Sequence, residues 1–164
     1  MSGNSVYVRI QQADFSVDAE ADALRAGDGR VGAVCAFVGT VRDAEGAVQA
    51  IELEHYPGMT ERAIAAMTQA AQERFGILGA RVVHRVGRLE AGERIVLVAT
   101  AAQHRRAAFE ACEFIMDMLK TQAPFWKKEY TAQGAHWVDA RVSDDAALAR
   151  WGVHSENVRS PSTN

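Results

Sequence analysis

Residues 119–129 place three lysines around a proline, and this segment is the part of the chain best suited to bind an anion. Pro124 fixes its own φ and disfavours the helical conformation of the preceding residue, so a helix that enters this segment ends just before it. Lys120 then lies in the last helical turn. The aromatic residues after the proline favour a strand, in which Lys127 and Lys128 point to opposite faces. One of these two lysines can therefore face Lys120, as a phosphate or carboxylate site would require.

Two further groups of cationic residues precede this segment. Arg42 follows a predicted strand, and His104 and Arg105 stand at the start of the predicted helix that ends near Lys120. A helix N-terminus offers unpaired N–H groups and a partial positive charge, which favours an anion at His104 and Arg105.

Each of these cations also has an ordinary structural explanation. A lysine in the last helical turn is favoured by the helix dipole, by about 0.3–1 kcal/mol. Lysines on an edge strand protect it against aggregation. Arginines at a helix start are often solvated surface residues. Residue type and spacing therefore leave both a structural role and an anion site open.

Composition and charge narrow the class of protein. The 164 residues are enough for one domain with a core that needs neither disulfides nor metal. The formal net charge of -3 argues against a general nucleic-acid binder, which would be basic. The N-terminus has no signal-peptide pattern, and no apolar run approaches the about 18 residues of a membrane span. We therefore expect a cytoplasmic protein that binds neither nucleic acid nor a membrane.

The spacing of histidines and cysteines indicates no metal site and no cofactor. The histidines lie in separate segments without an HxH or HExxH spacing. Cys35 and Cys112 each lie in an apolar run, which is typical of reduced, buried thiols. Signatures of a serine nucleophile, a P-loop or a dinucleotide-binding turn are missing from the sequence.

Hydrophobic periodicity predicts ten elements in the order β, α, β, β, α, β, β, α, β, β. Helices are predicted after the Ser16 N-cap, from a Thr60 N-cap to Gly76, and from His104 to the proline turn. The apolar run 31–38 predicts a central strand buried on both faces, and Gly39 after it allows a bulge or a close backbone approach. Residues 87–93 are predicted to be a loop. Further strands are predicted at 6–10, 48–56, 80–86, 95–102, 125–130 and 137–138.

These elements predict an α+β (mixed α/β) fold with helices against a sheet. We expect residues 1–153 to form a single domain and residues 154–164 to be a polar, disordered tail. On the third helix, Phe109, Cys112, Met116 and Leu119 form one stripe, which predicts core packing.

Four segments in this order resemble the large, catalytic subunit of molybdopterin synthase. They are Phe-Val-Gly-Thr-Val-Arg at 37–42, Leu-Glu-His-Tyr-Pro-Gly-Met at 53–59, His-Arg at 104–105, and Leu-Lys-Thr-Gln-Ala-Pro-Phe-Trp-Lys-Lys-Glu at 119–129. The similarity extends from about Val6 to Trp151, and the Pro-Phe-Trp-Lys-Lys run is its most specific part.

The resemblance implies a sulfurtransferase of molybdenum cofactor biosynthesis. It implies that cyclic pyranopterin monophosphate (precursor Z) receives two sulfurs as a dithiolene, from a small ubiquitin-like partner whose C-terminal Gly-Gly carries a thiocarboxylate. It further implies a heterotetramer with a homodimer of this chain at its centre, and an α/β hammerhead-like fold with an added small β subdomain. Sulfur that arrives on a partner requires no reactive cysteine in this chain.

The resemblance also implies roles for individual residues. Lys120 and Lys127 are expected to be catalytic, stabilising the oxyanion that develops during sulfur transfer, and one of them to exchange a proton. Arg141 is expected to reach the pocket from the neighbouring subunit. The residues expected to bind the substrate or line its site are Thr40, Val41, Arg42, His104, Arg105, Lys128, Glu129 and Arg141.

Two other functions remain open on the sequence alone. One is a different phosphate-handling transferase on the same scaffold. The other is a non-catalytic adaptor that docks a ubiquitin-like protein through its tail. The number of cations expected in one pocket disfavours the adaptor, because docking alone does not need them.

Overall fold

The computed structural model describes residues 6–138 and 142–152, which form two sheets and four helices. The elements are β1 (Val6–Gln11), α1 (Val17–Arg25), β2 (Ala33–Thr40), β3 (Ala50–His55), α2 (Met59–Phe75), β4 (Gly79–Arg85), β5 (Gly87–Glu90), β6 (Arg94–Ala102), α3 (Arg105–Gln122), β7 (Phe125–Thr131), β8 (Gly134–Val138) and α4 (Val142–Arg150). The predicted α+β class with a small second sheet is confirmed. The predicted tail, residues 154–164, lies outside the described residues.

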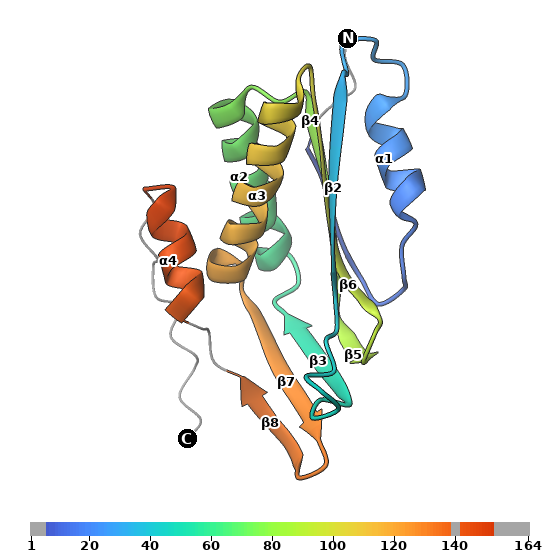
Figure 1. Cartoon of the computed structure of the whole chain (residues 1–164), viewed down its shortest axis with the longest axis vertical. Helices are drawn as coiled ribbons and strands as arrows, with labels where there is room; N and C mark the ends of the chain where they lie inside the picture. The colour runs from blue at the N-terminus through green and yellow to red at the C-terminus, as the bar shows by residue number, and fades with distance from the viewer. Residues whose placement is uncertain (1–5, 139–141, 153–164) are drawn as a thin grey trace.

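The larger sheet has the strand order β1-β4-β6-β2 and lies between two helical layers. Helices α2 and α3 cover one face and α1 covers the other (Figure 1). Alternation along the strands divides the core accordingly: Val82 and Val98 pack under α2 and α3, while Val83 and Leu97 pack toward α1. The smaller sheet, β5-β3-β7-β8, lies beyond the end of α3 (Figure 1).

Two parts of the larger sheet differ from the prediction. Strand β2 is not a central strand: within the described residues it pairs only with β6, and it is half exposed. A run of small apolar residues does not reveal which strand has a second neighbour. At Gly39, where the sequence allows a bulge or a close backbone approach, the pairing shifts register between Gly39 and Thr40. The predicted core residue Phe109 is 62% exposed on α3, although Cys112, Met116 and Leu119 are buried.

Other differences concern the element bounds. Residues 87–90 form strand β5 by pairing with β3, where a loop was predicted. Helix α2 begins at Met59 with Gly58 as N-cap, because Gly58 adopts a φ of 84° and its N–H donates to Glu61 at 2.5 Å. Helix α4 was not predicted. Within the described residues, no helix is long and apolar enough to cross a membrane.

Candidate active site

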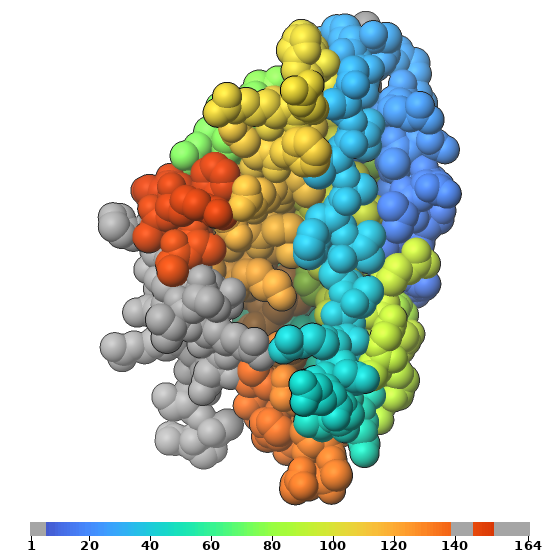
Figure 2. All heavy atoms as spheres, viewed as in Figure 1, coloured from blue at the N-terminus to red at the C-terminus, as the bar shows by residue number. Residues whose placement is uncertain are grey.

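A pocket of about 770 Å³ opens where the end of α3 faces β2 and the small sheet. This face of the molecule is seen in Figure 2, with α3 beside β2 above β3 and β7. Six of the predicted site residues line the pocket, and they come from the end of β2, the last turn of α3 and strand β7: Thr40, Val41, Arg42, Lys120, Lys127 and Glu129. Its apolar walls include Ile51, Leu53, Ile95, Leu119 and Ala123.

Lys120 and Lys127 reach the same pocket because the chain turns at Pro124 between them. Helix α3 ends at Gln122, as predicted, so Lys120 is the basic residue of its last turn. The turn is held by a hydrogen bond from the Thr60 hydroxyl to the Pro124 carbonyl, at 3.1 Å. Strand β7 then pairs Lys127 with Leu53 of β3, which places Lys127 on the pocket face.

Lys128 lies on the opposite face of β7, as the alternation of a strand requires. Its ammonium lies 4.8 Å from the ring centroid of Trp137, over the ring. Lys128 does not line the pocket.

The segment after β2 brings Arg42 to the pocket from a distant part of the sequence. Val41 is 3% exposed, and its backbone is held by Glu93 and Gly92, with N–H···O bonds of 2.8 and 2.7 Å. Because the backbone is anchored beside it, the exposed Arg42 side chain lies at the rim of the pocket.

Glu129 supplies negative charge to this otherwise cationic site. It lies opposite His136 in the β7–β8 pair, and the His136 Nε2 is 3.6 Å from the Glu129 carboxylate. Both residues line the pocket. The His136–Glu129 pair therefore places an acidic group beside the cations that line the pocket.

His104 and Arg105 lie at the other end of α3. His104 is the N-cap and Arg105 the first helical residue, fifteen positions before Lys120. At 1.5 Å per residue this separation is about 22 Å along the helix axis. Neither residue lines the pocket of its own chain. Arg141 lies outside the described residues.

The sequence prediction missed His84, which lines the pocket from β4. Its ring stacks on Phe125, with centroids 4.0 Å apart and an interplanar angle of 20°. The pKa of His84 is lowered to about 4. Burial is the main cause, the hydrogen bond with the Arg85 carbonyl opposes it, and the charges of Lys120 and His55 add to the lowering. A lone histidine in an apolar strand gives little sequence signal for such a position.

The Cys112 thiol is poorly suited to nucleophilic chemistry, whereas Cys35, which was predicted to be buried, is partly exposed. Cys112 is buried and its Sγ lies 3.5 Å from the Val98 carbonyl oxygen. Burial, and then the neighbouring Cys35, raise the pKa of the Cys112 thiol well above its usual range. No group of three or more His, Cys, Asp or Glu side chains among residues 6–138 and 142–152 is arranged to hold a metal ion.

Comparisons with known proteins relate the chain to one family. The family model described as MoaE protein matches residues 10–122. The molybdopterin synthase catalytic subunit of Ralstonia nicotianae is 59% identical over 152 residues, covering 92% of this chain and 86% of that protein. The molybdopterin biosynthesis MoaE protein of Burkholderia ambifaria has a solved structure that is 56% identical, with a TM-score of 0.80, and the match covers 91% of this chain and 99% of that chain.

A more distant structure shares the fold. It is a chain of the Helicobacter pylori complex between subunits 1 and 2 of molybdopterin-converting factor. Its sequence identity is 22%, its TM-score is 0.66, and the match covers 83% of this chain and 91% of that one.

Proposed function

The chain belongs to the MoaE protein family and is an enzyme of molybdopterin synthesis, and we propose that its pocket transfers sulfur from a partner's C-terminal thiocarboxylate to precursor Z. The partner is a small ubiquitin-like subunit that ends in Gly-Gly. The product is the dithiolene of molybdopterin. We propose that the enzyme acts in the cytoplasm.

The observation that carries this proposal is the convergence of Arg42, Lys120 and Lys127 on one pocket. Both proposed ligands are anionic, since the substrate has a cyclic phosphate and the partner ends in a thiocarboxylate. Cations in a partly enclosed site bind such groups more strongly than in water. The buried Cys112 supports sulfur delivery from outside the chain, because its thiol is held in the unreactive form.

The chemistry assigns one task to the two lysines and other tasks to the residues around them. In each transfer the thiocarboxylate sulfur bonds to a substrate carbon and a carbon–oxygen bond at that carbon breaks, so that the oxygen takes up protons and leaves as water or stays on the opened phosphate. Water then attacks the acyl carbon. The acyl carbon–sulfur bond breaks, so the sulfur stays on the substrate and the partner leaves as a carboxylate. Lys120 and Lys127 stabilise the oxyanion on the acyl carbon, and Arg42 holds the phosphate. Thr40, Val41 and Glu129 line the site and orient these groups.

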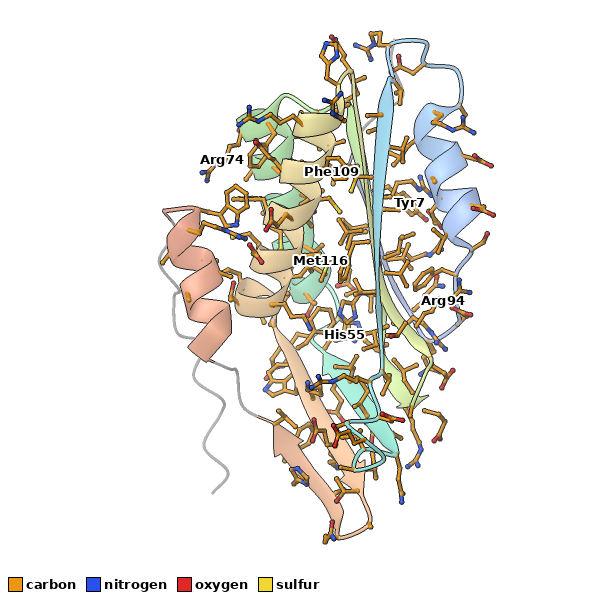
Figure 3. All side chains as sticks on the ribbon, in the orientation of Figure 1. Tyr7, His55, Arg74, Arg94, Phe109 and Met116 are labelled. Carbon is orange, nitrogen blue, oxygen red and sulfur yellow. The ribbon has the colours of Figure 1, made fainter. Side chains whose placement is uncertain are left out.

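We further propose that a second copy of the chain completes the site. His104 and Arg105 are too far from Lys120 to act in the same pocket of one chain, so their proposed role in substrate binding requires the helix start of another copy. The exposed Phe37 on edge strand β2 and the exposed Phe109 near the start of α3 support a contact between copies, because large apolar side chains there are otherwise solvated. Figure 3 shows Phe109 on the upper part of α3, beside β2.

The assembly that follows is a heterotetramer with a dimer of this chain at its centre and one small subunit at each end. Arg141 would reach the pocket from the neighbouring copy, and Lys128 would support the strand that carries Lys127. The complex of two subunits described for the Helicobacter pylori protein supports a second type of subunit, since its chain shares this fold.

A reconstituted reaction tests the proposal. The purified chain, the thiocarboxylated small subunit and precursor Z should yield a product with two added sulfurs, measured by mass spectrometry. Lys120→Ala should lower kcat by about 100-fold or more, the loss typical of one oxyanion-stabilising group. Arg106→Ala is the matched control, because the Arg106 side chain is 88% exposed on the same helix. Normal turnover by Lys120→Ala would contradict the assigned role. Binding of the small subunit without turnover by the wild type would favour the adaptor.

A further inference from the structure

His84 is a polar residue at a position where the fold provides for an apolar one. Along β4, Val82 packs under α2 and α3 and Val83 packs toward α1, so His84 returns to the face of Val82. Its side chain is 9% exposed and reaches the pocket. A valine or phenylalanine there would fill the space without the cost of burying a polar ring.

The hydrogen bonding of His84 defines which ring nitrogen is free to accept. Nδ1 lies 2.8 Å from the carbonyl oxygen of Arg85. Since a carbonyl oxygen only accepts, Nδ1 carries the hydrogen. Burial keeps the ring neutral at physiological pH, because the pKa of His84 is lowered to about 4. Nε2 is therefore unprotonated and is a hydrogen-bond acceptor.

Two neighbours connect His84 to the turn that carries the catalytic lysines. Phe125, the first residue of β7, stacks on the His84 ring and its N–H donates to the Ala123 carbonyl at 2.9 Å. Lys120 lines the same pocket, and its charge acts on the imidazole.

The charge of His55 of β3 also acts on His84, and the His55 Nε2 is 3.4 Å from the Glu61 carboxylate. Figure 3 places His55 at the junction of the helical layer and the small sheet. Among the described residues, the other charged or titratable groups that line the pocket are Arg42, Lys127, Glu129 and His136.

The charge state of the ring indicates how this acceptor is used. Because burial, the largest cause, lowers the pKa of His84 to about 4, the ring is neutral near pH 7 and is a weak proton acceptor. A neutral acceptor beside an ammonium orients the ammonium without removing its charge, and such a role matches an electrostatic stabiliser.

We infer that His84 is a positioning residue for Lys120: in the substrate-bound enzyme, its Nε2 accepts a hydrogen bond from the Lys120 ammonium and directs that charge toward the transferred sulfur. This inference rests on the proposed sulfur transfer. Hydrogen bonds of this kind commonly tighten only when the substrate is bound. The stack on Phe125 holds the ring in place, and the Arg85 carbonyl fixes its tautomer.

Two substitutions separate the acceptor from the ring. His84→Phe keeps the stack on Phe125 and removes the acceptor, whereas His84→Gln loses the stack and offers a carbonyl oxygen near the place of Nε2. In the reconstituted reaction, His84→Phe should lower kcat by about tenfold to a hundredfold with little change in KM, as for loss of one charge-assisted hydrogen bond. His84→Gln should recover most of this loss. A purely structural role predicts the reverse order, with phenylalanine the better replacement.

A double-variant cycle tests whether His84 acts through Lys120. Added to Lys120→Gln, His84→Phe should cause no further loss of kcat, because the partner is already gone. Independent, multiplied losses would overturn the inference, as would a rise in KM at unchanged kcat, which indicates direct substrate contact. Failure of the wild type to convert precursor Z would instead refute the proposed function.

A spectroscopic measurement applies even where the phenylalanine variant does not fold. In protein labelled with ¹⁵N-histidine and saturated with precursor Z, the Nε2 resonance of His84 should be that of an unprotonated nitrogen that accepts a hydrogen bond. It should move toward a free acceptor in Lys120→Gln. A resonance that is the same in both proteins would overturn the inference.

Discussion

Replacement of Thr60 by valine should disturb the active site, although Thr60 does not line the pocket. The Thr60 hydroxyl is fully buried, accepts a hydrogen bond from the Tyr56 N–H at 2.9 Å and donates one to the Pro124 carbonyl at 3.1 Å. It therefore ties the start of α2 to the turn between Lys120 and Lys127. Valine has nearly the same shape, so the substitution removes both hydrogen bonds and leaves packing almost unchanged.

The size of the effect follows from the groups left without partners. A buried polar group that loses its only partner costs about 1–3 kcal/mol. Pro124 is buried, whereas Tyr56 is 45% exposed and water can replace part of its loss. We therefore expect the free energy of unfolding to fall by about 2 kcal/mol, which corresponds to a Tm lower by roughly 4–8 °C in a chain of this length. A looser turn should also lower kcat by about tenfold or more, since small displacements of catalytic groups are costly.

Thr60→Ser is the matched control, because it keeps the hydroxyl and removes only a methyl group, at a cost of about 1 kcal/mol. Calorimetry and the reconstituted sulfur-transfer assay should be run on both variants and the wild type. The hydroxyl matters if Thr60→Val loses more stability and more kcat than Thr60→Ser. Equal Tm and equal kcat for the two variants would refute the idea that this bond positions the lysines.

Three further predictions concern other parts of the chain. The pKa of His84 is lowered from an ordinary 6.5 to about 4 in the folded protein, so on acidification the unfolded chain takes up a proton at this histidine before the folded protein does. The free energy of unfolding should therefore fall by up to about 3 kcal/mol as pH drops from 6.5 to 4. Urea titrations should show a smaller loss in His84→Phe, and the same pH dependence in both proteins would contradict this prediction. A Cys35→Ala, Cys112→Ala double variant should retain turnover with the thiocarboxylated partner, since neither thiol carries the sulfur, and loss of turnover in the folded variant would indicate thiol chemistry. Trp151→Phe should lower the free energy of unfolding, measured by urea titration, by about 1–2 kcal/mol. It removes the hydrogen bond from the Trp151 Nε1–H to Asp117 at 2.6 Å and keeps an aromatic ring. An unchanged midpoint of urea unfolding would show that this hydrogen bond does not stabilise the fold.

The sequence predicts those parts of the fold that depend on local rules. Pro124 ends α3, Gly76 ends α2, and strand alternation separates Lys127 from Lys128, because each follows from backbone geometry over a few residues. These rules require no knowledge of the tertiary structure.

The pairing of strands that are distant in sequence cannot be predicted from such local rules. The run that forms β2 is as apolar as a central strand, yet it lies at the sheet edge, and Phe37 and Phe109 beside it are exposed. An apolar side chain gives the same signal whether it packs in the core or on another copy. Strand β5 is only four residues long and is defined by its pairing with β3, so its own sequence resembles a loop.

The sequence predicted which residue types form the candidate site better than it predicted how they are arranged in space. The sequence indicates the cations, but their meeting in one pocket depends on the return of β7 alongside β3 and on the anchored backbone of Val41. The length of α3 separates His104 from Lys120 by more than a single pocket spans. His84 was missed because its importance arises from Phe125 and Lys120, which lie about forty residues away in sequence.

The origin of the sulfur is the central claim, and an isotope measurement tests it most directly. The small subunit should be prepared with a ³⁴S-labelled thiocarboxylate and mixed with unlabelled enzyme and precursor Z. We predict that both sulfurs of the dithiolene carry the label and that the small subunit is released with a carboxylate terminus. Unlabelled sulfur in the product, or labelled sulfur retained on this chain, would contradict the account.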